Sequence, residues 1–382
     1  MALIFINTMH KSKIKFIILS FFFTLIYACT EKFYPEIDAD ISILVVDGKI
    51  TNKPGPYEVR LFRTVDLIRV DTLKPEQGAI IMINDDLGNS EILWETSPGV
   101  YRTQNSNFQG QIGRSYWIEI QTNSGEKYES NPETIQPEII IKSIYGEEKK
   151  LLLEDASTVN AAKLYIDASD PTNQSSYVRW EYRESWEWRN PYFEPKTANP
   201  SKICYPFLRS DNVFVFDGSG QKIKEFKHLP TSYITENEVK LNYEYFINVA
   251  MYSVNFENYE FWRNIKESIQ QNGGLYNVIP ANTIGNVYAC DSKATVLGYF
   301  EASSVNTMTA KFSTQDFQMK FIDFPQDCKD IEMRFRDWHP DESKFHILKD
   351  YFEGEVHVFI VRYNYCYDCS VKYSPTKPSF WP

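Results

Sequence analysis

Short runs of alternating apolar and polar residues dominate the chain from residue 41 onward. In YEVRLFRTVDL (57–67), for example, Val59 and Leu61 alternate with charged residues. Such alternation places successive side chains on opposite faces of a β-strand. Similar runs occupy residues 41–50, 79–85, 90–96, 99–103, 114–122 and 126–130. Short strands at this spacing predict an immunoglobulin-like β-sandwich over residues 41–137.

Turn-forming residues separate these runs. The segment Asp85–Asn89 (DDLGN) predicts a hairpin, and Asn123–Gly125 predicts a second turn. Asp85 and Asp86 could ligate calcium, but the spacing of an EF-hand loop is missing, so we interpret both as turn residues. Because the Cys…Trp…Cys pattern of antibody domains is also missing, only the sandwich architecture is predicted.

Residues 138–382 predict a larger β-rich domain. Prolines at 132 and 137 end the first series of strands, and strand-like runs continue beyond them. One of these, NVFVFDGSGQKIKEF (212–226), predicts a hairpin around Gly218–Gly220.

One amphipathic helix is predicted near residues 256–272. Four apolar residues recur there at helical spacing: Tyr259, Trp262, Ile265 and Ile269. Asn255 or Asn258 can cap the start of the helix, and Gly273 lies just beyond its end. We expect the apolar stripe to pack on a sheet. The predicted fold class is mainly β, with an N-terminal immunoglobulin-like β-sandwich followed by a larger β-rich domain that carries this helix.

The N-terminus has the features of an export signal. Three lysines precede the apolar run FIILSFFFTLIYA (16–28), and Cys29 follows it. The run is shorter than the roughly 20 residues that a membrane-spanning helix needs. An ordinary cleaved signal is the alternative. Because a cysteine stands at the boundary, we interpret residues 1–28 as a lipoprotein signal peptide, Cys29 as the lipidation site and residues 29–40 as a tether.

The charge and the cysteines restrict the partners and the compartment. The formal net charge is −11, and removal of a signal that contains only basic charges makes the chain more acidic. An acidic surface argues against a nucleic-acid partner. Disulfides are permitted in an exported protein. Of the five cysteines after Cys29, the four nearest the C-terminus are the candidate disulfide formers: Cys290, Cys328, Cys366 and Cys369.

The Cys366-x-x-Cys369 spacing has three interpretations. A zinc site would need two further ligands at fixed spacing, and a thioredoxin-like redox pair would need a βαβ context. Neither feature is found in the sequence. A structural disulfide needs nothing extra, and either cysteine could reach Cys290 or Cys328, or the two could bond together.

The run YVRWEYRESWEWR (177–189) is the strongest candidate for a binding surface. If it is extended, one face carries a row of aromatic residues: Trp180, Tyr182, Trp186 and Trp188. Such rows anchor ligands or partners at interfaces. We favour the alternative that the row packs into a core, because large aromatic side chains bury readily against another layer. Glu184 interrupts the row, and we expect it to mark an edge of the strand.

No catalytic residue, metal site or cofactor is predicted. The histidines lie outside any HExxH pattern, and the sequence has neither a GxSxG elbow nor a glycine-rich phosphate loop. A glycosidase-type pair of carboxylates stays open, because its geometry depends on the tertiary structure.

Three segments carry a resemblance to a known family. The run NYEFWRNIKESIQQNGGLYNVIPANTIGNVYACDSKATVLGYFEAS (258–303) resembles the middle of a Bacteroidota surface-lipoprotein family, domain of unknown function family 4249. Residues 44–61 are similar to its start, and residues 366–381 to its end. The resemblance implies an accessory lipoprotein that accompanies TonB-dependent outer-membrane receptors, and it brings no catalytic motif.

We therefore expect a non-enzymatic outer-membrane lipoprotein, at the cell surface rather than on the periplasmic face. Its expected partners are the outer membrane, through the lipid, and a β-barrel receptor. Two alternatives are a surface glycan hydrolase with a carboxylate pair and a structural subunit of an envelope assembly complex. The sequence does not identify a ligand.

Overall fold

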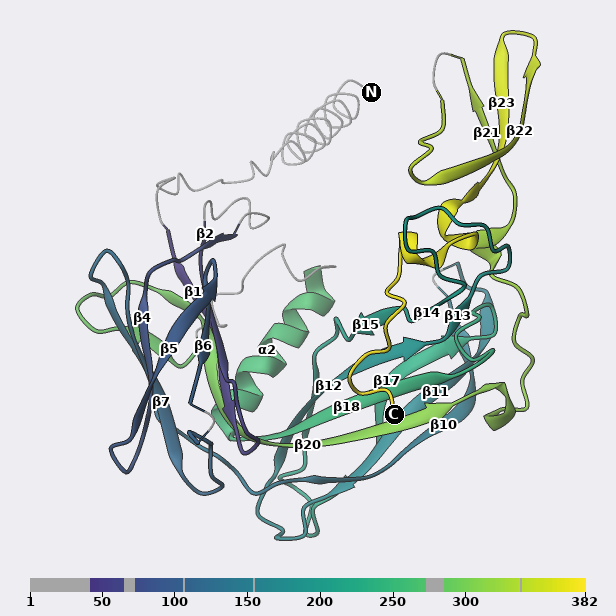
Figure 1. The fold of residues 1–382 in the computed structure, drawn as a ribbon. Coiled ribbons are helices and arrows are strands. Elements are labelled where there is room, and N and C mark those ends of the chain that lie inside the picture. Colours follow the sequence, from purple (N-terminus) through teal and green to yellow (C-terminus); the bar gives the residue numbers. More distant parts are fainter. Residues whose placement is uncertain (1–41, 65–72, 106, 154, 273–284, 337–338) are drawn as a thin grey trace, which may run out of the picture. The chain divides into compact units, whose positions relative to one another are not determined.

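A computed structural model describes residues 42–64, 73–105, 107–153, 155–272, 285–336 and 339–382 (Figure 1). Residues 42–382 form one compact unit. The signal peptide, Cys29 and the tether, which the sequence predicts for residues 1–40, lie outside the described residues. Among those that are described, no helix combines the length and the apolar character needed to cross a membrane.

The N-terminal region forms the predicted β-sandwich. Its strands are β1 (Leu44–Thr51), β2 (Glu58–Thr64), β3 (Leu73–Pro75), β4 (Ile80–Asp85), β5 (Ser90–Ser97), β6 (Val100–Thr103), β7 (Ser115–Gln121), β8 (Lys127–Ser130) and β9 (Glu133–Thr134). The hydrogen-bonded order runs β1-β2-β6-β5-β4-β7-β8, with β3 on β2 and β9 on β7. Asp85–Asn89 joins β4 to β5 in the predicted hairpin, in which the amides of Leu87 and Asn89 donate to Asp85 Oδ1 at 2.9 Å.

Alternating burial produces the core of the sandwich. Every second residue of β7 is buried, and Ile118 is fully enclosed with Val46, Leu61 and Ile81. The period-two pattern of the sequence therefore identified the inward faces correctly.

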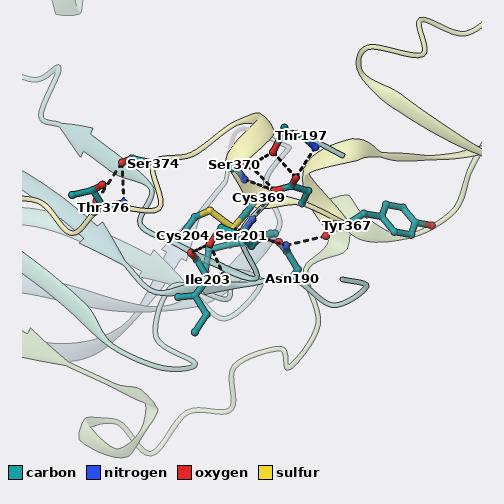
Figure 2. The surroundings of a disulfide bond; sticks show 12 residues. Asn190, Thr197, Ser201, Ile203, Cys204, Tyr367, Cys369, Ser370, Ser374 and Thr376 are labelled. Carbon is teal, nitrogen blue, oxygen red and sulfur yellow. Dashed lines mark hydrogen bonds between the residues drawn. A yellow bond between two sulfur atoms is a disulfide. The ribbon is translucent and has the colours of Figure 1, made fainter. Parts of the chain in front are cut away.

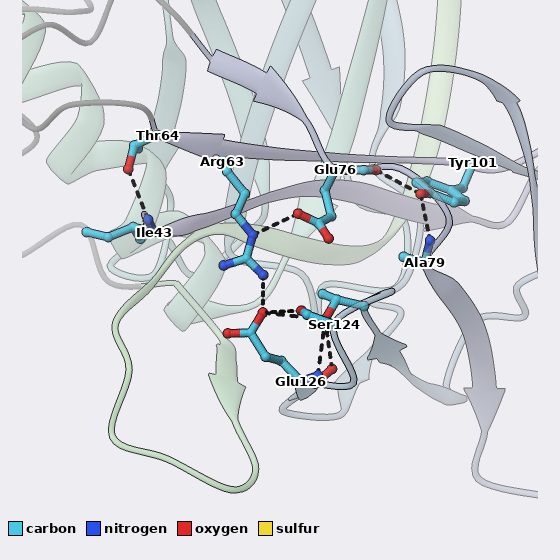
Figure 3. Close-up of polar contacts among 9 residues, drawn as sticks. Ile43, Arg63, Thr64, Glu76, Ala79, Tyr101, Ser124 and Glu126 are labelled. Atoms are coloured by element: carbon cyan, nitrogen blue, oxygen red, sulfur yellow. Dashed lines mark hydrogen bonds and ion pairs between the residues drawn. The ribbon is translucent and has the colours of Figure 1, made fainter. Parts of the chain in front are cut away.

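Polar contacts join the strands at the rim of the sandwich (Figure 3). Arg63 on β2 donates to Glu76, at 2.7 Å, and to Glu126 in the β7–β8 turn. The hydroxyl of Tyr101 donates to the Glu76 carbonyl at 2.8 Å and accepts from the amide of Ala79 at 3.0 Å. These contacts hold the segment between β3 and β4 against β2 and β6.

Two strands from much later in the chain complete this sheet. They are β19 (Val287–Ala289), which pairs with β8, and β20 (Val296–Phe312), which runs parallel to β1. At Gly298, φ is +92°, and a Cβ there would lie 1.8 Å from the carbonyl oxygen of Val46. Glycine is therefore required for β20 to approach β1. The domain boundary near residue 137 stays a prediction, and the sandwich core includes residues beyond it, such as Phe300.

The remaining strands form a second β-rich region. They are β10 (Ile140–Leu152), β11 (Thr158–Ser169), β12 (Tyr177–Trp186), β13 (Trp188–Arg189), β14 (Ile203–Cys204), β15 (Phe207–Arg209), β16 (Phe214–Asp217), β17 (Glu225–Thr235), β18 (Tyr245–Val254), β21 (Ile331–Phe335), β22 (Phe345–Glu353) and β23 (Val356–Tyr363). Short 3₁₀ helices cover Thr314–Asp316, Gln326–Cys328, Asn364–Cys366 and Cys369–Val371.

Two layers enclose the core of this region. One is the sheet β10-β11-β17, and the other is formed by β12, β18 and β20, which continue the large sheet. Ile166 on β11, Val178 on β12 and Ile247 on β18 are fully buried between them. The predicted hairpin around Gly218–Gly220 is wrong, because β16 pairs with β12 whereas β17 pairs with β11.

The predicted helix is confirmed as α2 (Phe256–Asn272). Asn255 caps it, since its Oδ1 accepts from the amide of Asn258 at 2.8 Å. The helix packs on the sheet through aromatic residues: Tyr259 stacks on Tyr177, with ring centroids 5.1 Å apart, and Phe261 lies 4.8 Å from Tyr299. The fold is mainly β, as the sequence predicts.

Candidate functional site

The aromatic row on and after β12 lies in the interior. Trp180, Trp186 and Trp188 are 3%, 8% and 6% exposed, and Tyr182 is half-buried. The indole N–H of Trp180 donates to the carbonyl of Pro230 at 3.0 Å. The row therefore packs in cores, and its interpretation as an exposed binding surface is wrong for the three tryptophans.

Glu184 is the centre of a buried polar network. Its Oε2 accepts from Ser232 at 2.8 Å and from the Tyr245 hydroxyl at 2.7 Å, and its Oε1 accepts from Lys240 Nζ at 2.9 Å. The expectation that Glu184 marks a strand edge is wrong, because β15 and β18 pair with β12 on its two sides. Lys240 compensates the buried charge.

Two disulfides link the C-terminal segment to the rest of the fold. Cys204 bonds to Cys369 (Figure 2), and Cys328 bonds to Cys366. The structural interpretation of Cys366-x-x-Cys369 agrees with both bonds. The inclusion of Cys290 among the disulfide formers is wrong, because it is free and exposed. Cys204 takes its place, since the fold brings β14 beside a segment 165 residues away in sequence.

Hydrogen bonds near these disulfides join the same segments. Asn190 Nδ2 donates to the carbonyls of Ser201 and Tyr367 at 2.8 and 3.1 Å (Figure 2). Asp368 accepts from the amides of Lys196 and Ser201 at 3.0 and 3.1 Å. Burial alone would raise the pKa of Asp368, but these bonds and those from Ser370 and Thr197 hold it well below its usual range.

The last residues of the chain also pack against the rest of the fold. Trp381 is 7% exposed, and its ring centroid lies 4.5 Å from that of Phe246 on β18 and 5.0 Å from that of Tyr205. The tail is therefore part of the folded protein.

A cluster of charged side chains lies between α2 and the large sheet. Arg179 on β12 donates twice to Glu301 on β20, from Nε at 3.1 Å and from Nη2 at 3.0 Å. The central carbon of its guanidinium lies over the ring of Tyr252, 4.3 Å from the centroid, and over the ring of Trp262 in α2, 4.8 Å from the centroid. Arg179 and Glu301 are buried, so this pair is shielded from solvent.

A second carboxylate extends the cluster to β1. Glu181 accepts from the Tyr252 hydroxyl at 2.6 Å and lies 3.7 Å from Lys49 Nζ. Burial raises the pKa of Glu181, but Lys49 and Arg179 outweigh it and bring the pKa to about 2. Two cations and two carboxylates thus neutralise one another across β1, β12 and β20.

Glu133 lies beside this cluster and has a strongly perturbed pKa. It accepts from the Tyr299 hydroxyl, from the amide of Ala302 at 3.0 Å and from Asn255 Nδ2 at 3.2 Å. Burial raises the pKa of Glu133 to about 7, and the nearby charge of Glu301 acts in the same direction. The carboxyl of Glu133 therefore ties β9 to β20 and to the cap of α2. No local pattern in the sequence predicts these contacts, because each partner lies more than a hundred residues away.

The outer surface of the sandwich carries a set of exposed apolar side chains on β4 and β5, here called the apolar face. Its members are Ile80, Ile92 and Trp94, which are exposed, and Met82, which is partly buried. Ile80, Ile92 and Trp94 are 57%, 50% and 57% exposed. Met82 lies opposite Ile92 in the β4–β5 ladder.

Charged residues border the apolar face. Arg102 lies opposite Trp94 in the β5–β6 ladder. Glu58 forms ion pairs of 2.6 Å with both Arg60 and Arg102. Contiguous exposed apolar residues with a polar rim are typical of interaction surfaces. Sequence reasoning missed this face, although the alternation Ile80-x-Met82 and Ile92-x-Trp94 places apolar residues on the side opposite the core.

The described residues contain no group of three or more His, Cys, Asp or Glu side chains that could hold a metal ion. Asp85 and Asp86 act as turn and ion-pair residues. Asp85 binds amides of its own turn, and Asp86 pairs with Arg114.

These observations define a mainly β, disulfide-stapled protein with an apolar outer face and a charge cluster beneath its helix. The family model described as a domain of unknown function (DUF4249) matches residues 30–309. This is more than half of the chain, and the chain therefore belongs to that family. Comparison with curated proteins gave no match.

Proposed function

We propose that this protein is a non-enzymatic, outer-membrane accessory lipoprotein that docks on a β-barrel receptor and helps it to take up a ligand. The apolar face carries this proposal. Three large side chains at least half exposed on adjacent strands cost solvation free energy unless a partner covers them, at roughly 25 cal/mol per Å² of apolar area.

The predicted lipid favours a partner in the membrane. If Cys29 is acylated, about fifteen residues separate the lipid from β1, so even a fully extended chain would keep the sandwich within about 50 Å of the bilayer. At the border of the apolar face Glu58 pairs with Arg60 and Arg102, so these three side chains together are not acidic, although the chain as a whole is.

The disulfides support export. Two disulfides of long sequence separation are typical of proteins that fold in an oxidising compartment, such as the periplasm or the cell surface. Glu181, Glu184 and Glu301 are each paired with a cation, which favours a structural role for these three carboxylates. We place the protein at the cell surface, which protease shaving of intact cells tests.

Affinity capture of the tagged protein in mild detergent tests the proposal. The wild-type protein should retain a β-barrel protein, and Trp94→Ser should reduce the retained amount at least tenfold. Leu152→Ser is the matched control, because Leu152 is 74% exposed at the end of β10 and lies outside the apolar face. If the wild-type protein retains no barrel protein, or if both variants behave alike, the proposal is wrong.

A further inference from the structure

The outer face of the β10-β11-β17 sheet carries a second, independent cluster. The Tyr145 hydroxyl on β10 donates to Asp167 Oδ1 on β11 at 3.1 Å and lies 3.2 Å from Nδ1 of His228 on β17. Burial raises the pKa of Tyr145 to about 12, together with its bond to Asp167, so the hydroxyl keeps its proton. Because that proton points to Asp167, the hydroxyl oxygen accepts from Nδ1–H of His228.

This chain of hydrogen bonds orients the imidazole and sets which ring nitrogen of its neutral form carries the proton. In that neutral form, Nδ1 is protonated and Nε2 carries the lone pair, so Nε2 is a hydrogen-bond acceptor. Within the part of the chain that the structure describes, Nδ1 of His228 has polar partners and Nε2 has none. The side chain of His228 is half exposed, so the acceptor is available to a ligand.

The backbone holds His228 in an uncommon conformation. Its φ is +59°, in the left-handed region, which is uncommon for residues other than glycine although Asn, Asp and His are enriched there. Its amide donates to Asp167 Oδ1 at 2.8 Å, next to an irregularity in the β11–β17 ladder. The imidazole stacks on the Tyr165 ring, with centroids 3.7 Å apart. Such conformations persist where surrounding contacts enforce them, and they cluster at functional positions.

A second row of residues on the same face of this sheet contributes an aromatic ring and side chains of both charges. Glu147, Lys163 and Tyr233 lie opposite one another on β10, β11 and β17. Tyr233 is 54% exposed. Glu147 pairs with Lys149 at 2.8 Å, so the surface offers donors and acceptors without an excess of one charge.

We propose that this cluster binds a neutral saccharide. The exposed rings of Tyr233 and His228 can pack on the apolar faces of sugar rings, while Nε2 of His228 and Glu147 accept from sugar hydroxyls and Lys163 donates to them. The balanced charges favour an uncharged, hydroxyl-rich ligand over an ionic one. This site lies on a different sheet from the apolar face, so it does not depend on the proposed receptor.

Affinity electrophoresis of the full chain in gels containing neutral glucans, mannans, galactans or xylans tests the site, with dextran sulfate as the charged comparison. At least one neutral polysaccharide should retard the wild-type protein. His228→Asn, which tolerates the left-handed backbone, and Tyr233→Ala should each weaken retardation at least tenfold. Tyr288→Ala, at a tyrosine 44% exposed on β19, should not change it.

Three results would overturn the inference. They are the absence of retardation in every neutral gel, retardation by dextran sulfate alone, and unchanged retardation of both site variants. Tyr145→Phe supplies a further measurement, because it keeps the ring and removes the hydroxyl that orients His228. It should weaken binding less than His228→Asn does, with circular dichroism confirming that each variant is folded.

Discussion

Arg179 and Glu301 form a double hydrogen bond between β12 and β20, although 122 residues separate them in sequence. Both side chains are buried, and the guanidinium of Arg179 contacts the rings of Tyr252 and Trp262. The pair thus joins a strand of the second β-rich region to the strand that runs beside β1 of the sandwich.

We expect Arg179→Leu to reduce the free energy of unfolding by about 3–5 kcal/mol, because it leaves Glu301 buried without its cation. Urea unfolding followed by tryptophan fluorescence measures the change. Arg60→Leu is the control: Arg60 is 45% exposed in its ion pair with Glu58, and its loss should change stability by less than about 1 kcal/mol. Equal effects of the two substitutions would contradict the role given to the buried pair.

Glu133 predicts a pH dependence of stability. Its pKa is about 7 in the folded protein and about 4.5 in the unfolded chain, so the folded state binds the proton more tightly. The contribution of the Glu133 proton to the free energy of unfolding is therefore complete below about pH 4.5. It is lost as the pH rises through 7, and the whole loss is about 3 kcal/mol.

Urea unfolding between pH 4.5 and 7.5 measures this dependence, and Glu133→Gln should remove most of the slope because glutamine does not titrate. All other ionisable groups are present in both proteins, so the difference between their pH profiles isolates Glu133. The assignment is wrong if the free energy of unfolding of the wild-type protein, taken relative to that of the variant, stays constant or rises between pH 4.5 and 7.5.

The sequence predicted features that depend on neighbouring residues. The Asp85–Asn89 hairpin follows from turn chemistry, and α2 follows from an apolar stripe that starts at an asparagine cap. Strand alternation likewise identified the sandwich core. Contacts between distant segments were not predictable, because no local pattern encodes them. The Glu184 network, the Cys204–Cys369 bond and the return of β20 to β1 are of this kind.

Removal of the Cys204–Cys369 disulfide, by changing both cysteines to serine, should lower the free energy of unfolding by about 4 kcal/mol. The bond closes a loop of 165 residues, and its loss frees the unfolded chain. Cys290→Ser should leave the stability unchanged, since Cys290 is free and exposed. Thermal unfolding without reductant compares the variants. A destabilised Cys290→Ser protein, or an unaffected double variant, would contradict these assignments.

Cys29→Ser tests the predicted anchor. Several acyl chains at one residue bind a membrane firmly, at about 0.8 kcal/mol per buried CH₂ group, whereas the rest of the chain is acidic. The variant should move from the membrane fraction to the soluble fraction after cell lysis, and metabolic labelling with a fatty-acid analogue should be lost. Membrane association that persists in the variant would show that another segment anchors the protein.

Site-specific photo-cross-linking at position 94 tests most directly whether the apolar face contacts a receptor. A photoreactive phenylalanine analogue in place of Trp94, activated in intact cells, should yield a covalent adduct with an outer-membrane β-barrel protein. The same analogue at position 152 should yield none. The account would be contradicted if position 94 gave no barrel adduct, or if the two positions gave the same adducts.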